Sequence, residues 1–287
     1  MKTIAVLIDF SERSEHAAKY ALHLAKKIKA DVILYHLDLV PVSKKPVLTS
    51  GYPDDEAQDL RSEINDQLEA FSARLKSQLI ERCSPHSFLP EIKYDQDNQE
   101  IVDVMTSIVN NDDVILIVTA PPDSQDMAAY MLSDHCQQIM HWAPVPVMIV
   151  PGTTIIRNPE KIAITINLGE LDTDYINVLA NLVAQFSPEI MVSHLTENHS
   201  LGDTFTHLEK KFLASIHKRV NYGRVYYRRI IVGGQKGWKW LNDNKKCDVL
   251  AISHQQQKVL NEFFNLGRTP EVSHHITIPV IVLPDMG

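Results

Sequence analysis

The stretch Ile4-Ala5-Val6-Leu7-Ile8-Asp9-Phe10-Ser11-Glu12, at the start of the chain, decides the fold. Residues 4–8 form an uninterrupted apolar run that ends at Asp9. Such a run is typical of a strand that is buried on both faces, as in a parallel sheet. Ser11 then precedes acidic Glu12, a combination typical of the start of a helix. The stretch therefore predicts a strand that passes directly into a helix.

The same alternation of strand and helix continues through the first half of the chain. After Ser11, apolar residues recur at intervals of three or four up to Ile28, which predicts a helix. Further strands are predicted at 32–37, near 88–94, at 114–118 and at 145–150, and further helices from residue 53, over about 100–109 and near 133–141. Strands separated by helices imply right-handed crossovers and a parallel sheet, so the predicted fold class is α/β.

The pattern of the first half begins again in the second half. The equivalent pairs are Asp9 and Asn167, His36 and His194 (both pairs 158 residues apart), and Pro146 and Pro279 (133 residues apart). The second copy is therefore about 25 residues shorter (158 − 133). We expect two unequal copies of one α/β domain, in residues 1–152 and 159–287. In the second copy, strands are predicted at 161–166, 190–194, 224–232, 249–253 and 280–283, and helices at 175–186, 208–218 and 238–242.

The composition of the chain excludes several classes of protein. The 287 residues are 44% hydrophobic and carry 36 acidic against 28 basic side chains, a formal net charge of −8. This balance is ordinary for a soluble globular protein and argues against a general nucleic-acid binder, which has a basic surplus. The three cysteines form no Cys-x-x-Cys, so a disulfide framework and a zinc ribbon are excluded. No apolar run approaches 18 residues and no signal peptide is visible, so we expect a cytoplasmic protein outside the membrane.

Segments from both halves of the chain resemble the universal stress protein family. In the first half they are residues 4–12, residues 17–25, Ala30-Asp31-Val32-Ile33-Leu34-Tyr35-His36 and Ala143-Pro144-Val145-Pro146-Val147-Met148-Ile149-Val150. The second half is similar through Asn167, His194 and residues 278–282. The resemblance covers nearly the whole chain as a tandem pair. It implies two Rossmann-like (adenine-nucleotide alpha hydrolase-like) domains, each a five-stranded parallel sheet flanked by helices.

Many members of that family bind ATP at the carboxyl ends of the strands. They use an acidic residue after the first strand and a loop that reads Gly, two residues, Gly, nine residues, Gly, then Ser or Thr. Glycine lets the backbone approach phosphates, and a helix N-terminus adds a favourable dipole. In the first half, Asp9 takes the acidic position and the four loop positions hold Ala120, Asp123, Ser133 and Asp134.

The loop of the first half keeps the spacing of the family but has no glycine. Pro121 and Pro122 lie between its first two positions and have no N–H to offer a phosphate. Each aspartate of the loop would repel a phosphate charge by about 4 kcal/mol, at roughly 4 Å and an effective dielectric near 20. Ser133 or Asp134 would also occupy helix N–H groups as a cap. We therefore expect that the first site has lost ATP.

The second half departs from the family loop in a different way. Asn167 stands in the acidic position, and the loop positions hold His254, Gln257, Gly267 and Arg268. One glycine survives, and Arg268 with His254 could meet an anion. We favour the interpretation of Arg268 as a solvated surface arginine and of Gly267 as an ordinary helix-entry glycine. The alternative function is an ATP-binding protein or slow ATPase switch that uses Asn167, Gly267 and Arg268.

Motifs for other chemistry are absent from the sequence. No Walker phosphate loop, nucleophile elbow or His-Glu-x-x-His is present, so we expect no enzyme. His274-His275 lacks a third ligand at a useful spacing, so we expect no metal. Basic residues between positions 210 and 229 interleave with tyrosines, a composition that suits single-stranded nucleic acid. We favour instead a solvated helix face and an edge strand guarded by charge.

The resemblance also implies how the chain would associate. Domains of that family commonly dimerise through their last strand, so residues 145–150 and 280–283 would form an internal pseudo-dimer, and the chain could also form a homodimer. We expect a stress-response protein without a cofactor that binds an unknown protein partner or a small ligand, and that binds neither nucleic acid nor membrane. An apolar ligand held between the halves is a third reading, for which the sequence has no direct sign.

Overall fold

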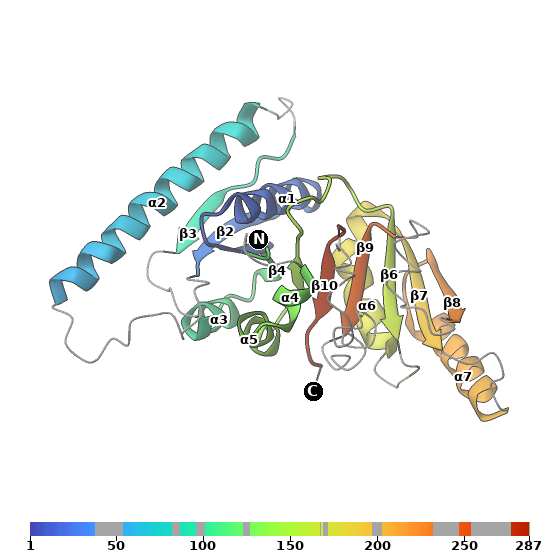
Figure 1. Ribbon diagram of the computed structural model, residues 1–287. Coiled ribbons are helices and arrows are strands. Elements are labelled where there is room, and N and C mark those ends of the chain that lie inside the picture. Colours follow the sequence, from blue (N-terminus) through green and yellow to red (C-terminus); the bar gives the residue numbers. More distant parts are fainter. Residues whose placement is uncertain are drawn as a thin grey trace. The chain divides into compact units, whose positions relative to one another are not determined.

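The computed structural model describes residues 1–37, 54–81, 87–95, 101–122, 127–166, 168, 172–196, 203–231, 247–253 and 277–286 (Figure 1). The chain divides into two compact units: unit 1 is Met1–Val145 with Ile149–Ile156, and unit 2 is Pro146–Met148 with Arg157–Gly287. Each unit contains a parallel sheet with helices, so the predicted α/β fold class is confirmed. That residues 1–152 and 159–287 are two copies of one domain remains a prediction.

The sheet of unit 1 has its first strand between two neighbours. Its parallel strands β1 (Thr3–Ile8), β2 (Asp31–His36), β3 (Ile92–Asp95) and β4 (Val114–Thr119) lie in the order β3-β2-β1-β4. Residues Ile4 to Ile8 are all buried, as the uninterrupted apolar run predicts. After β5 (Val147–Ile149), the N–H of Val150 donates to the carbonyl of Thr119 at 2.8 Å, so the chain returns to the carboxyl end of β4.

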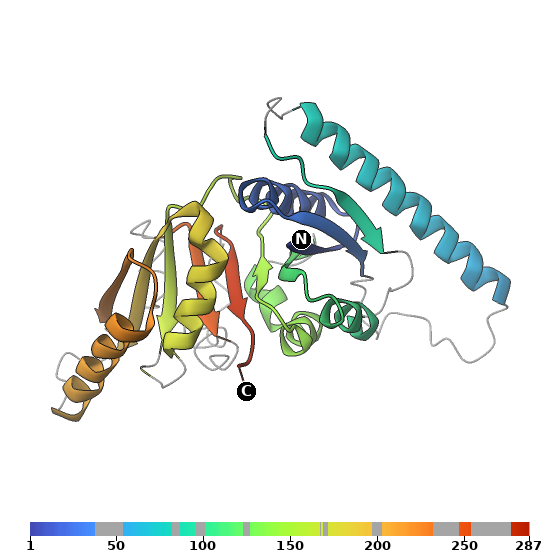
Figure 2. The ribbon, with the colours of Figure 1, turned by 180° about the vertical axis from the view of Figure 1, so that it is seen from behind.

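The helices of unit 1 cover both faces of this sheet (Figures 1 and 2). Helices α1 (Glu12–Ile28) and α2 (Asp54–Glu81) lie on one face, and α3 (Ile101–Val109), α4 (Met127–Leu132) and α5 (Asp134–Trp142) lie on the other. The faces differ because β2 and β3 succeed β1 toward one edge whereas β4 lies on its other side, and right-handed crossovers then lead the helices to opposite faces. Small buried side chains of α1 (Ala17, Ala18, Ala21 and Ala25) allow it to pack closely on the strands.

Helix α4 is the element of unit 1 that the sequence analysis did not predict. The sequence predicts one helix near 133–141, whereas the structure has α4 before it and α5 after a break at Ser133. Residues 127–132, Met-Ala-Ala-Tyr-Met-Leu, are apolar throughout and too few to show a helical period. The break follows from capping, because the hydroxyl of Ser133 begins the second helix.

Unit 2 repeats the arrangement of strands. Its parallel strands β6 (Lys161–Ile166), β7 (Glu189–Thr196), β8 (Val225–Ile231), β9 (Val249–Ser253) and β10 (Val280–Leu283) lie in the order β10-β9-β6-β7-β8. Helix α6 (Asp172–Val183) continues into a 3-10 turn, η2 (Ala184–Phe186), and α7 (Asp203–Arg219) joins β7 to β8. The helix predicted at 238–242 lies outside the described residues.

The first strand, helix and strand of the two units follow one backbone plan. The β1–β2 ladder runs from Thr3↔Asp31 to Ile8↔His36, and the β6–β7 ladder runs from Lys161↔Glu189 through Ile166↔His194, which is the same register with 158 added to each number. The described non-glycine residues with positive φ are Phe10 (60°), Lys29 (56°), Leu168 (61°) and Ser187 (52°). They form two pairs with the same offset of 158, since 10 + 158 = 168 and 29 + 158 = 187.

The helix ends at Lys29 and Ser187 carry a prediction about stability. Lys29 ends α1 and Ser187 ends η2, each in the left-handed region that glycine adopts without a steric penalty. We expect Lys29→Gly and Ser187→Gly each to raise the free energy of unfolding by about 0.5–1 kcal/mol, because relief of the Cβ clash exceeds the entropy that glycine adds to the unfolded chain. Urea unfolding followed by circular dichroism measures the change.

The matched controls are Lys29→Ala and Ser187→Ala, which remove the same side-chain atoms beyond Cβ but keep the clash. They should show no gain. Glycine variants that are no more stable than the alanine variants would contradict the assignment of strain to these two positions.

Candidate functional site

The carboxyl ends of β1 and β4 form the place in unit 1 where a ligand is expected. The strand order reverses between them, since β1 is followed by β2 on one side and β4 lies on the other. Ligands of parallel α/β sheets bind outside the carboxyl ends of the strands at such a switch point. Asp9 follows β1 and Ala120 follows β4, so the structure brings these two predicted residues to the same edge of the sheet.

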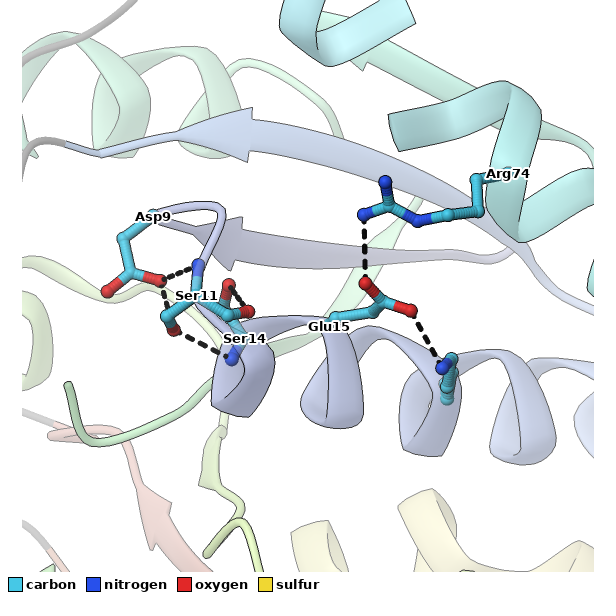
Figure 3. Close-up of polar contacts among 6 residues, drawn as sticks. Asp9, Ser11, Ser14, Glu15 and Arg74 are labelled. Carbon is cyan, nitrogen blue, oxygen red and sulfur yellow. Dashed lines mark hydrogen bonds and ion pairs between the residues drawn. The ribbon is translucent and has the colours of Figure 1, made fainter. Parts of the chain in front are cut away.

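Asp9 organises the turn from β1 into α1 (Figure 3). Its Oδ1 accepts a hydrogen bond from the N–H of Ser11 at 3.0 Å and another from the Ser11 hydroxyl at 2.6 Å. The Ser11 oxygen in turn accepts from the N–H of Ser14 at 3.1 Å, which caps the helix. Of the two carboxylate oxygens of Asp9, only Oδ1 has hydrogen bonds with the residues drawn in Figure 3. Oδ1 of Asp9 therefore holds the start of α1 in place.

Phe10 lies in the same turn with a strained backbone. Its φ of 60° is rare for a bulky side chain and costs about 1–2 kcal/mol. Its ring stacks on the imidazole of His36, with the ring centroids 4.8 Å apart and the planes at 18°. It also meets Phe71 of α2 edge-on, with the centroids 5.9 Å apart. The Phe10 ring therefore lies over the carboxyl ends of β1 and β2. The sequence analysis missed this residue, although a bulky residue inside a tight strand-to-helix turn was a signal for it.

Helix α2 is held to this turn by charge as well as by aromatic contact. The Arg74 guanidinium carbon lies 5.1 Å from the centroid of the Phe71 ring. The guanidinium also donates to Glu15 of α1 at 2.8 Å (Figure 3). Lys19 pairs with the other Glu15 oxygen at 2.7 Å. Burial raises the pKa of Glu15, but Lys19 and Arg74 lower it by more, so the net shift is downward and the carboxylate is charged at neutral pH.

The segment after β4 offers few groups to a phosphate. Ala120 is buried at 3% exposure, and the two prolines that follow it have no N–H. The carbonyl of Pro122 accepts a hydrogen bond from Arg13 Nη1 of α1 at 2.8 Å. Arg13 also lies so close to Gly152 that a Cβ there would come within 2.9 Å of its Cγ. The segment is thus tied to α1, and Arg13 is engaged with its own chain. Asp123 lies outside the described residues.

The N-terminus of α5 is capped by the chain itself. The Ser133 oxygen accepts from the N–H of Cys136 at 3.2 Å, and its hydroxyl donates to the carbonyl of Tyr130 at 2.7 Å. Asp134, in the first helical turn, is exposed and brings a negative charge to the positive end of the helix dipole. Ser133 therefore engages one N–H group of this helix end, and the charge of Asp134 opposes that of a phosphate.

A buried phenol lies next to the end of β4. The Tyr130 hydroxyl is 3.3 Å from the Thr119 hydroxyl at the end of β4, and its residue is 1% exposed. Burial raises the pKa of Tyr130 well above its usual value, and Cys136 and Asp9 add to the rise. Burial also raises the pKa of the Cys136 thiol. Both groups are protonated at neutral pH, so neither is an activated nucleophile. Tyr130 was invisible to the sequence analysis because it belongs to the unpredicted helix α4.

The predicted site residues of unit 2 cannot be compared in this way. Asn167, His254, Gln257, Gly267 and Arg268 lie outside the described residues. His194, which pairs with Ile166 as His36 pairs with Ile8, is buried in β7. Its pKa is lowered, mainly by burial and also by Arg229, while Glu209 acts in the opposite direction.

Three arginines of the basic stretch of unit 2 form ion pairs within that unit. Arg219 pairs with Asp174 at 3.3 Å, Arg224 with Glu189 at 3.7 Å and Arg229 with Glu209 at 3.5 Å. Each of these arginines has an acidic partner within unit 2. Within the described ranges, no three His, Cys, Asp or Glu side chains gather as metal ligands, and none of the helices is long and apolar enough to cross a bilayer.

Comparison with known proteins agrees with this architecture. Residues 1–151 match the model of the Universal stress protein family, and no curated protein matches the chain at a significant level. A solved universal stress protein from Archaeoglobus fulgidus DSM 4304 is similar, with a TM-score of 0.66 and 11% identity over 98% of both chains. A functionally unknown protein from Pseudomonas aeruginosa PAO1 has a TM-score of 0.53 and 10% identity, over 99% of this chain and 92% of that one. The cytoplasmic domain of a prokaryotic cation chloride cotransporter has a TM-score of 0.50 and 10% identity, over 99% and 95%. At these identities the solved structures show a shared fold.

The turn at Asp9 carries a prediction about stability. Asp9→Ala removes the acceptor of both Ser11 hydrogen bonds and should lower the free energy of unfolding by about 1.5–3 kcal/mol, because the bonds involve a charged group. Asp9→Asn keeps an oxygen in place and should cost about 1 kcal/mol or less. Urea unfolding of the two variants measures the difference, and equal losses would mean that Oδ1 does not hold the turn.

The cap of α5 carries a second prediction. Ser133→Ala leaves the N–H of Cys136 without its acceptor and should cost about 1 kcal/mol. Ser133→Asp restores a capping oxygen and should recover most of that loss. Thermal unfolding by calorimetry tests the pair; no difference between them would show that the cap contributes nothing.

Proposed function

Because the chain belongs to the universal stress protein family, we propose that it is a non-catalytic stress-response protein whose first unit has lost its ATP site and which acts by binding a partner or a small ligand. Family membership supports a stress-type function. The proposal adds that the nucleotide site at the switch point of unit 1 is degenerate and that the chain has no catalytic machinery.

The main support for the proposal is that the chain's own residues engage the groups at the phosphate end of this site. The backbone after β4 has prolines at positions 121 and 122, and the hydroxyl of Ser133 takes the N–H of Cys136 at the start of α5. Asp134 adds a negative charge at that helix end. A triphosphate needs N–H donors and a positive field, and the described part of this end of the site is poor in both.

The non-catalytic part of the proposal is supported by the protonation of the buried groups. Tyr130, next to Thr119 at the end of β4, and Cys136 of α5 are buried, and burial keeps both in their neutral forms. One structurally similar protein is a domain of a cotransporter, which agrees with the use of this fold outside enzymes.

The tandem part of the proposal is that residues 1–152 and 159–287 are two universal stress protein domains. It is supported by the common register of β1–β2 and β6–β7 and by the two pairs of positive-φ residues at an offset of 158. The universal stress protein from Archaeoglobus fulgidus also aligns over 98% of both chains, not over one half. We further propose that the last strands of the two domains form an internal pseudo-dimer, and that the chain could also form a homodimer.

Calorimetric titration with ATP tests the proposal on the purified full chain. We expect no binding tighter than about 1 mM, because the phosphate end of unit 1 is closed. Arg268→Glu is the matched variant for unit 2, and it should behave as the wild-type protein does. Micromolar binding with a stoichiometry of two, or nucleotide carried by the native protein in mass spectrometry, would contradict the proposal. A stoichiometry of one that is lost in Arg268→Glu would establish the ATP switch in its place.

A further inference from the structure

Phe10 has a role that the turn itself does not require. Unit 2 makes the same turn with Leu168, whose φ of 61° matches the 60° of Phe10. The strained backbone therefore forms with an aliphatic side chain as well as with an aromatic one. Unit 1 differs from unit 2 in having an aromatic ring at this position, and the contacts of that ring indicate its role.

The ring of Phe10 lies as a bound planar ligand would lie. It is nearly parallel to the imidazole of His36, at 18° and 4.8 Å between centroids, and Phe71 closes one edge at 72° and 5.9 Å. Offset stacking on one face and an edge-to-face contact on another side are the two arrangements that aromatic rings prefer. His36 is the last residue of β2, so the stack is at the carboxyl edge of the sheet, where ligands of such sheets bind.

We infer that the face of the His36 ring in unit 1 is a stacking site for a neutral planar heteroaromatic ring such as a purine, and that Phe10 occupies this site and thereby excludes such ligands. The inference rests on the proposed function, because it names the residue that closes the base end of the degenerate site. Pro121, Pro122 and Ser133 close the phosphate end of the site, and Phe10 closes the base end.

Adenosine is the probe. It carries a planar base but no phosphate, so its binding does not depend on the loop after β4. Phe10→Gly removes the ring and suits the positive φ. Stacking of one base converts to about 5- to 150-fold in affinity, so Phe10→Gly should bind adenosine at least about 5-fold more tightly than the wild-type protein. Leu168→Gly is the matched control, since it makes the same change at the same φ in unit 2, and it should bind as the wild type does.

The ring-proton resonances of His36 locate the binding. They are assigned by their absence from the spectrum of His36→Asn. Loss of the Phe10 ring current should move them downfield in Phe10→Gly, and adenosine should move them upfield again. If Phe10→Gly does not fold, Phe10→Asn replaces it, because asparagine tolerates positive φ better than other residues with a side chain.

Several outcomes would overturn the inference. They are the absence of an adenosine-dependent shift of the His36 resonances in a folded Phe10 variant, an equal gain in Leu168→Gly, and adenosine binding at His36 in the wild-type protein. Failure of the proposed function has a different signature. ATP binding by the wild type without a shift of the His36 resonances would contradict the proposed function and leave Phe10 as the occupant of the stacking site.

Discussion

The turn that leaves β1 is the constraint on which the rest of unit 1 depends. The chain passes from a strand that is buried along its length into α1 within residues 9–11, and Phe10 has to take a positive φ to do so. Three hydrogen bonds that link Asp9, Ser11 and Ser14 hold the turn against the strain. Because α1 begins at this point, the turn also decides how its alanine face meets the sheet and where Arg13 and Glu15 reach their partners.

The geometry of the candidate site depends on that turn, and contacts within unit 1 hold the described residues after β4 and at the start of α5. Arg13 holds the carbonyl of Pro122 from the first turn of α1, so the segment after β4 is placed without any glycine. Ser133 starts α5 with its own hydroxyl, so the helix forms without a phosphate at its end. The loop can therefore change while β1, β4 and their helices keep their places, which is how one fold accommodates different functions.

Much of the fold could be predicted from the sequence, because its signals are local. The apolar run at residues 4–8 and the spacing of alanines in α1 report burial and helical period directly. The predicted repeat, which stays a prediction, likewise rests only on a constant offset, as between Asp9 and Asn167. Helix α4 was missed because six consecutive apolar residues have no period. Phe10 and Tyr130 were missed because their partners are His36, Phe71 and Thr119, which are 11 to 61 residues away in the chain.

The sequence by itself determined the alternation of strands and helices, the acidic Asp9 after the first strand and the absence of glycine from the loop of unit 1. These are properties of residue type and spacing, which need no knowledge of what lies nearby. Only the tertiary structure decided that Phe10 stacks on His36, that Arg13 holds Pro122, and that Tyr130 lies buried and protonated beside Thr119. The contacts depend on segments that crossovers bring together at one end of the sheet, and the protonation of Tyr130 depends on its burial. Residues next to each other in the chain reveal neither the contacts nor the burial.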